Sequence, residues 1–180
     1  MTRYNDLQNN LTPAIPFVFL YDIVGNQTFG TSGAFHDWDT VRVLSSHFDY
    51  TATKDRIYLN TNSSGLFKVT FECSFVTYDE DDDLLITSSI YKNGTQLVGS
   101  KVMCSVTGAA SQDDDIKNSQ TLTYIVYLEK NDYIQIETET DANTVYSIGN
   151  TSRLIIEFLP MRGWNNSSGG QTNYRGGVMR

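Results

Sequence analysis

The sequence predicts an all-β protein built as an antiparallel sandwich, and three observations predict it. Within residues 65–77, apolar and polar side chains alternate without a break from Phe67 to Phe75, which is the pattern of a strand with one buried face. From Trp38 onward, short strand-like runs recur, each closed by turn residues such as Asn, Asp, Ser and Gly. Aromatic residues make up 12% of the chain, including 11 Tyr and 9 Phe, which suits a core packed between two sheets.

The chain begins with a polar, Asn-rich segment, residues 1–34, which ends in a Gly-rich stretch. We predict that it forms an N-terminal arm. Its one apolar insert, residues 16–21, contains Phe17 and Phe19, which we expect to anchor the arm on a partner. The apolar run of residues 14–24 is too short and interrupted to span a membrane and has no basic leader, so we expect no signal peptide either.

We predict that residues 35–160 form the sandwich and contain no helix. The clearest turn is Asn93-Gly94, because these two residues accept the positive φ angles of a type I′ hairpin and so make their flanking strands antiparallel neighbours. A second tight turn is expected at residues 130–132. The predicted strands are residues 40–44, 47–50, 56–60, 66–77, 84–92, 96–106, 121–129, 133–140 and 153–159.

The chain ends with residues 161–180, which are rich in Gly, Asn and Ser. Such a composition cannot build a core of its own, so we predict a C-terminal tail that is ordered only on a partner. Trp164 and Tyr174 are its expected apolar anchors.

Four segments resemble one family of trimeric heads. Residues 64–69 (Ser-Gly-Leu-Phe-Lys-Val) resemble its Gly-x-Tyr/Phe strand opening, and residues 89–94 (Ser-Ile-Tyr-Lys-Asn-Gly) its strand ending in Asn-Gly. Residues 128–136 are similar to its Leu-x-x-Gly-Asp-x-Val segment, and residues 153–159 stand where its last strand ends. Over residues 38–160 the order of these motifs resembles the jelly roll of tumour necrosis factor (TNF) and of the globular head of the complement first component's q subunit.

This resemblance implies a jelly-roll β-sandwich that forms a compact homotrimer, mostly through aromatic and aliphatic side chains. The sequence itself indicates an apolar surface that the core of one subunit does not cover. Residues 121–129 carry apolar groups on both faces, as do residues 153–159, so one face fills the core and the other must be covered. A subunit interface is the expected cover, and an arm of the same chain is the alternative. The candidate trimer contacts are Leu122, Tyr124, Ile125, Tyr127, Ile155, Phe158 and Leu159.

The strand at residues 65–77 has one fully polar face, which includes Lys68 and Glu72. We expect that face to meet solvent away from the trimer centre. Substitution of Lys68 or Glu72 is therefore expected to leave assembly intact, whereas a charge at Ile125 or Tyr127 is expected to disrupt it.

Few residues of this chain suggest catalysis. His36 and His47 are the only histidines and lack the spacing of a metal site, so we expect no enzyme and place both at the surface or at an edge. The two cysteines, Cys73 and Cys104, are expected to be buried thiols, with a single bridge between the sheets as the alternative.

Two other binding functions remain open. Asp79, Asp81 and Asp83 stand at alternate positions of an acidic loop and are calcium candidates, although a solvated loop is the simpler interpretation and no other cofactor is expected. Aromatic side chains can stack on sugars, or they can be core or trimer contacts instead. The aromatic candidates for a glycan site are Trp38, Tyr50, Tyr58, Tyr78 and Tyr91.

The charge balance limits the partners. The formal net charge is −8 without any run of Lys or Arg, so nucleic acid is not an expected partner. We favour a structural or adhesion protein on the surface of a virion or phage, a head decoration or fibre head held by its arms to a capsid or other surface protein and able to meet a host glycan or receptor. The alternatives are a secreted or cell-surface ligand- or carbohydrate-binding head and a small-virus jelly-roll coat protein. The coat protein is disfavoured because residues 1–34 hold a single basic residue, Arg3.

Overall fold

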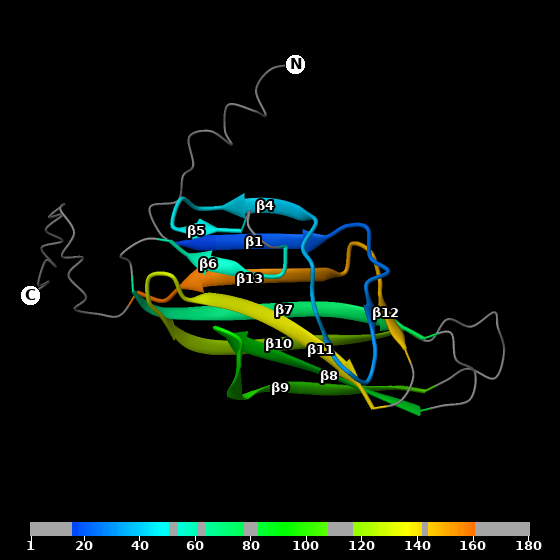
Figure 1. Ribbon diagram of the computed structural model, residues 1–180. Helices are drawn as coiled ribbons and strands as arrows, with labels where there is room; N and C mark the ends of the chain where they lie inside the picture. The colour runs from blue at the N-terminus through cyan, green and yellow to red at the C-terminus, as the bar shows by residue number, and fades with distance from the viewer. Residues whose placement is uncertain are drawn as a thin grey trace, which may run out of the picture.

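The computed structural model describes residues 16–50, 54–60, 64–77, 83–107, 117–141 and 144–160. These residues form strands, turns and loops without a helix, and the strands make two antiparallel sheets that pack face to face (Figure 1). The predicted all-β sandwich is confirmed. No helix that could cross a membrane occurs in this part of the chain.

The larger sheet, sheet A, has seven strands in the order β2-β12-β7-β13-β1-β4, and β10 pairs with the free edge of β7. β12 and β13 therefore share the other edge of β7, one after the other. The strands are β1 (Phe17–Asp22), β2 (Thr28–Phe29), β4 (Thr40–Leu44), β7 (Gly65–Val76), β10 (Lys117–Leu128), β12 (Val145–Ser147) and β13 (Ser152–Phe158).

The smaller sheet, sheet B, has six strands in the order β5-β6-β11-β8-β9, and β3 pairs with β11. Side chains of β10 reach across to β9, where the amide of Asn118 donates to the carbonyl of Ser105, so the two sheets meet along this edge. The strands are β3 (Ala34–Phe35), β5 (Phe48–Asp49), β6 (Ile57–Leu59), β8 (Asp83–Lys92), β9 (Thr95–Thr107) and β11 (Tyr133–Thr140).

The alternation along β7 produces the central part of the core. Its inward side chains, among them Phe67, Phe71 and Phe75, are fully buried, while the polar residues between them are half-buried on the outer face. The same side of β10 contributes Leu122 and Val126 to this core. Burial of such a side chain stabilises a fold by about 1.5–3 kcal/mol, so β7 is the main apolar support of sheet A.

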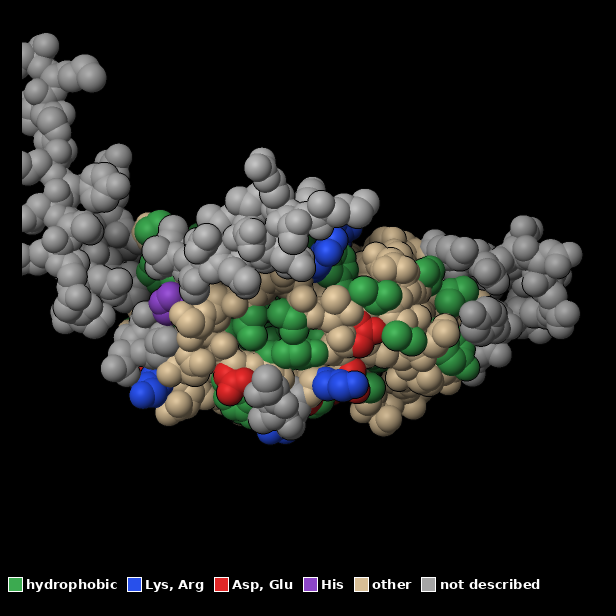
Figure 2. All heavy atoms as spheres, turned by 90° about the horizontal axis from the view of Figure 1, so that it is seen from above, with side chains coloured by type: hydrophobic (Ala, Val, Ile, Leu, Met, Phe, Trp, Pro, Cys, Tyr) green, Lys and Arg blue, Asp and Glu red, His purple; other side chains and the backbone are tan. Residues whose placement is uncertain are grey.

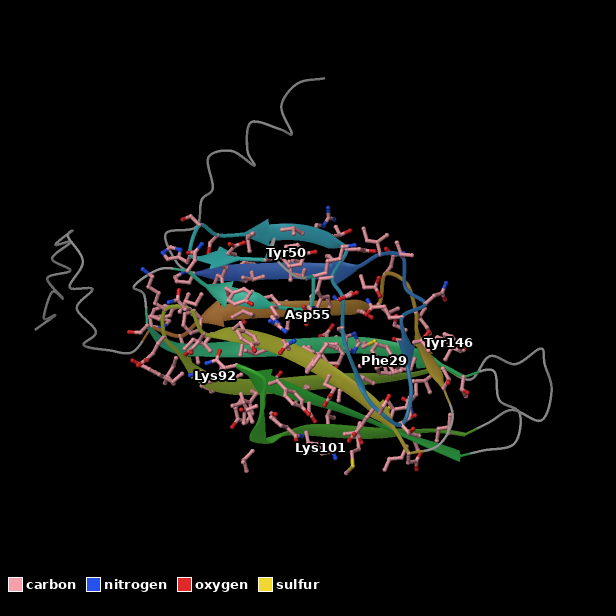
Figure 3. All side chains as sticks on the ribbon, in the orientation of Figure 1. Phe29, Tyr50, Asp55, Lys92, Lys101 and Tyr146 are labelled. Carbon is pink, nitrogen blue, oxygen red and sulfur yellow. The ribbon has the colours of Figure 1, made fainter. Side chains whose placement is uncertain are left out.

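The two predicted turns have the expected backbone. Asn93 and Gly94 have φ angles of 53° and 76°, which are the two positive values of a type I′ hairpin between β8 and β9. In the turn between β10 and β11, Asn131 has a φ of 71°, and Asp132 accepts a hydrogen bond from Lys92 at 2.7 Å (Lys92 is labelled in Figure 3). This ion pair joins the two turns at one end of the sandwich.

The N-terminal boundary of the sandwich differs from the prediction. β1 lies inside sheet A between β13 and β4, with Phe19 opposite Ile155 on one side and Val43 on the other. The sandwich therefore includes residues well before the predicted boundary at residue 35, and Phe17 and Phe19 are strand residues rather than anchors of an arm. β2 and β3, also within or next to the predicted arm, pair with β12 and β11. Trp164 and Tyr174 lie outside the described residues.

The position of β7 also corrects an expectation. β10 and β13 are the two strands that are apolar on both sides, and β7 lies between them, hydrogen-bonded to β10 on one edge and to β13 on the other. The polar face of β7 is therefore adjacent to their outward faces. Lys68 is the direct neighbour of Ile125. The predicted separation between a solvent strand and two interface strands is therefore wrong, since all three share one face.

Candidate functional site

The outer face of sheet A is a candidate surface that extends over five strands, and we call it the A-face. It consists of the outward side chains of β4, β1, β13, β7 and β10, which the strand register aligns in rows. The central row runs across all five strands and contains no charged residue. Its members are Val43, Phe19, Ile155, Thr70 and Thr123.

The two rows beside the central row carry charges in matched pairs. Glu72 lies 2.5 Å from Arg153 in one row, and Lys68 lies 3.1 Å from Glu157 in the other. Such partly exposed pairs add little stability, about 0–1 kcal/mol each. Each of these acids is therefore opposed by a base although the whole chain carries a net charge of −8, and Arg42 on β4, 6.0 Å from the ring centre of Tyr21, adds a positive charge at this face.

Several large apolar side chains of the A-face remain uncovered. Ile125 is 55% exposed, Tyr127 is 48% exposed and Val43 is 37% exposed. On β1 the ring of Phe19 lies 4.6 Å from the ring of Tyr21. Exposed apolar groups of this kind mark interaction surfaces. Figure 2 looks along the edge of the sandwich that carries β4, beside the A-face, and shows hydrophobic side chains near the middle of that edge with scattered charges among them.

The structure divides the seven predicted trimer contacts between the A-face and the core. Ile125, Tyr127 and Ile155 point outward on the A-face. Tyr124 and Phe158 pack against the core from the inner side, and Leu159 follows the end of β13 with a half-buried side chain. Leu122 is only 6% exposed and belongs to the core, so its assignment to a subunit contact is wrong.

One shallow pocket opens at the end of the A-face where β7, β10 and β13 meet, with a volume of about 200 Å³. Most of its lining residues are polar, and the hydroxyls of Ser74 and Ser119 are hydrogen-bonded at 2.8 Å. Such a lining suits a small polar molecule or ordered water more than an apolar ligand. The lining residues are Glu72, Cys73, Ser74, Ser119, Gln120, Thr121, Asn150, Thr151 and Arg153.

His36 is not at the surface, contrary to expectation. It is completely buried, and its Nε2 atom lies 2.8 Å from the hydroxyl of Thr138. Burial lowers the pKa of His36 from 6.5 to about 3, so the imidazole is neutral at physiological pH. Its ring packs among four aromatic rings at centroid distances of 4.5–6.4 Å, from Phe29, Trp38, Phe71 and Phe75.

Both cysteines are free thiols, but only Cys73 is buried as predicted. Cys73 is buried, and its sulfur lies 3.0 Å from the hydroxyl of Ser152. Burial raises the pKa of Cys73 to about 12. Cys104 is half-buried and accepts a hydrogen bond from Gln120, and burial raises its pKa as well. A thiol becomes a good nucleophile only as the thiolate, so neither cysteine is prepared for nucleophilic chemistry.

The calcium candidates fall largely outside the described part of the chain. Asp79 and Asp81 lie beyond it, and Asp83 begins β8 without a described side chain. Within the described ranges no three His, Cys, Asp or Glu side chains come together as a metal site. The calcium hypothesis therefore stays a prediction.

The aromatic candidates for a glycan site separate into different environments. Trp38 is fully buried, so it cannot present a stacking platform, and Tyr50 donates a hydrogen bond to the carbonyl of Trp38. Tyr58 and Tyr91 belong to the outer side of sheet B. Tyr58 pairs with Tyr133 at a ring distance of 5.1 Å, and Tyr91 with Phe35 at 5.3 Å. Tyr78 lies outside the described residues.

Comparison with known proteins concerns the fold. No family model and no curated protein matches the chain. Among solved structures, Eiger TNF from S. frugiperda aligns with 81% of this chain and 93% of its own, at a TM-score of 0.56 and 13% sequence identity. At so low an identity the likeness shows the fold alone, and the chain is accordingly a jelly-roll β-sandwich of the TNF-like type.

Proposed function

We propose that this protein is a non-enzymatic head that assembles as a homotrimer through the A-face and serves as a structural or adhesion protein on a virion or phage surface. The observation that carries the proposal is the A-face itself, an uncharged row flanked by neutralised charges, with Ile125 and Tyr127 about half exposed. The TNF-like sandwich supports it, because the resemblance in the sequence implied a trimer of this class.

The chemistry of the A-face favours contact with another copy of the same chain. An acidic subunit repels its copies unless the surfaces that meet are locally neutral. Here Glu72 is paired with Arg153 and Lys68 with Glu157, so these four charges are already neutralised beside the uncharged central row, while Arg42 lies over the ring of Tyr21 at the β4 edge of the face. Burial of Ile125 and Tyr127 then supplies the hydrophobic contribution.

The second part of the proposal concerns how the head is attached to the surface of a particle. We assign the attachment to a capsid or other particle-surface protein to residues 1–15 and residues 161–180, which precede and follow the described part of the chain. Trp164 and Tyr174 are the aromatic anchors in the second segment. The remaining surface of the head then stays available to a host glycan or receptor.

A carbohydrate- or ligand-binding head is the second candidate, and one observation favours it. The outer side of sheet B carries two aromatic pairs, Tyr58 with Tyr133 and Tyr91 with Phe35. Tyr91 also donates a hydrogen bond to Glu137, which places a carboxylate beside an aromatic ring, as glycan sites do. A glycan array would test this candidate, and binding that survives loss of the trimer would favour it.

The experiment for the trimer compares two matched charge substitutions by size-exclusion chromatography with light scattering. We expect the wild-type chain to have the mass of three subunits and the Ile125→Asp variant to have the mass of one. The control is Met103→Asp on β9, because Met103 is 59% exposed and Ile125 55%, but Met103 lies on sheet B. A monomeric wild-type chain, or equal loss of the trimer in both variants, would contradict the proposal.

A further inference from the structure

β9 begins with an irregularity that the sandwich does not require. Ser89 of β8 pairs with Lys101, but Tyr91, two residues further along, pairs with Gln96. Residues 97–100 therefore stand opposite the single residue Ile90 and bulge out of the sheet. The resulting sharp bend at the start of β9 is visible in Figure 1, and Lys101, which follows it, is labelled in Figure 3.

The bulge is held by specific interactions and is not a slack loop. Gly99 adopts a φ of +80°, a conformation that side-chain-bearing residues avoid. Ser100 is fully buried, and its hydroxyl lies 2.7 Å from the carbonyl of Leu97 and accepts a hydrogen bond from the amide of Ile90 at 3.2 Å. From the other sheet, the hydroxyl of Tyr124 donates to the carbonyl of Val98 at 2.9 Å. Both sheets thus fix the bulge.

The product of this arrangement is a single aliphatic side chain held out in solvent. Val98 is 94% exposed, more than any other large hydrophobic residue in the described part of the chain. No charged residue occurs between Thr95 and Ser100. An apolar side chain on a hydrogen-bonded backbone, with uncharged neighbours, is the kind of residue that fills a pocket at a protein interface.

The position of Val98 indicates which surface it meets. Tyr124, which braces it, belongs to β10, the edge strand of sheet A, and the next residue, Ile125, points outward on the A-face. Because the side chain of Tyr124 points to the inner side of sheet A, Val98 lies at the β9–β10 edge of the sandwich and not on the A-face. A closed ring of three identical subunits joins two different patches at each contact, so the A-face needs a second patch as its partner.

We propose that Val98 is the knob of that second patch and that it packs on the uncharged row of the A-face of the neighbouring copy, against Phe19 and Ile155. The inference rests on the proposed trimer and deepens it by naming the residues that meet. An uncharged knob suits the central row, whereas the rows on either side carry the ion pairs of Arg153 and Lys68.

The direct test is cross-linking of the full-length Val98→Cys/Ile155→Cys variant. Copper phenanthroline and oxygen would remove two electrons and two protons from each pair of thiols to form a disulfide. On a non-reducing gel we expect covalent dimers and trimers. The matched control pairs the same partner with a residue on the outer side of β9, as Met103→Cys/Ile155→Cys, and together with the two single variants it is expected to stay monomeric on the gel.

A second measurement separates the knob from the trimer. The Val98→Asp substitution alters an exposed side chain, and we expect it to raise the concentration at which the trimer forms roughly a hundredfold, as removal of an interface anchor does. If the wild-type chain is a monomer, the proposed trimer itself is wrong. If the wild-type chain is a trimer but Val98→Asp leaves it intact and Val98→Cys/Ile155→Cys gives no cross-link, the trimer stands and the knob is refuted.

Discussion

At the scale of single residues, His36 shows how the core constrains a titratable group. Its ring lies between strands that are far apart in the sequence, with Phe71 on β7 at 4.8 Å and Thr138 on β11 as the hydrogen-bond partner at 2.8 Å. Thr138 is in turn hydrogen-bonded to Ser88. A proton on this imidazole would place a charge in a fully buried aromatic site, which explains the low pKa.

The consequence is a pH dependence of stability with a defined sign. The pKa of His36 is about 3 in the folded state and 6.5 ordinarily, so below pH 6.5 the unfolded chain binds the proton that the folded chain refuses. As the pH falls from 6.5 to 3, His36 therefore lowers the free energy of unfolding by about 1.4 kcal/mol for each pH unit. Between pH 7.5 and pH 5 we expect a loss of about 2 kcal/mol.

Urea unfolding at the two pH values measures this loss, and variants assign it. The His36→Leu variant is expected to lose about 2 kcal/mol less than wild type over the same interval, whatever its absolute stability. His47→Gln, measured over the same interval, is the matched control for removal of a histidine that is only half-buried. An unchanged pH dependence in His36→Leu would show that other groups cause the acid sensitivity.

At the scale of elements, the β8–β9 hairpin depends on a turn residue that only glycine serves well. Gly94 has a φ of +76°, and a Cβ atom added there would lie 3.4 Å from the hydroxyl of Tyr133, an ordinary contact. The cost of a side chain is therefore conformational and not steric. We expect Gly94→Ala to lower the free energy of unfolding by about 1–2 kcal/mol.

The matched control is Gly30→Ala. Gly30 lacks a positive φ, and an added Cβ would meet nothing within 4 Å, so the same chemical change should leave stability unchanged or raise it slightly. Chemical denaturation of both variants in parallel measures the difference. Equal midpoints for the two variants would mean that the turn conformation does not limit the stability of this hairpin.

The same elements show what could be predicted from the sequence. β7 was predictable because its alternation is a local property of residues 65–77, and the β8–β9 hairpin because Asn93 and Gly94 specify their own turn. β1 was missed because Phe17, Phe19 and Tyr21 make its outward face as apolar as its inward face, which removes the alternation. β2 and β3 are two residues long and exist only through their partners.

The candidate site was predictable only in part for a similar reason. The two apolar faces of β10 were evident, but which face meets the core depends on the opposite sheet, so Leu122 and Ile125 could not be separated. The place of β7 between β10 and β13 is a property of strand order, which no local pattern encodes. Val98 was missed because its exposure follows from the four-residue bulge in the register of β8 and β9.

At the scale of the whole molecule, assembly and stability become one equilibrium. If the folded subunit binds two copies of itself and the unfolded chain does not, mass action stabilises the folded state as protein concentration rises. For a trimer, a tenfold rise contributes about 0.9 kcal/mol per subunit, two thirds of the 1.4 kcal/mol that a tenfold change represents. For a chain of this size the corresponding shift in Tm is roughly 2–4 °C.

A hundredfold rise in protein concentration should therefore raise the Tm of the wild-type chain by roughly 4–8 °C, which thermal unfolding measures. The Ile125→Asp variant should unfold at a Tm that does not depend on concentration, because its charge blocks the A-face while the core below it, including Val126, is unchanged. Met103→Asp, on the opposite sheet, should keep the wild-type slope. A flat wild-type response would exclude a trimer that contributes to stability, and a flat response in Met103→Asp as well would place the contact elsewhere than on the A-face.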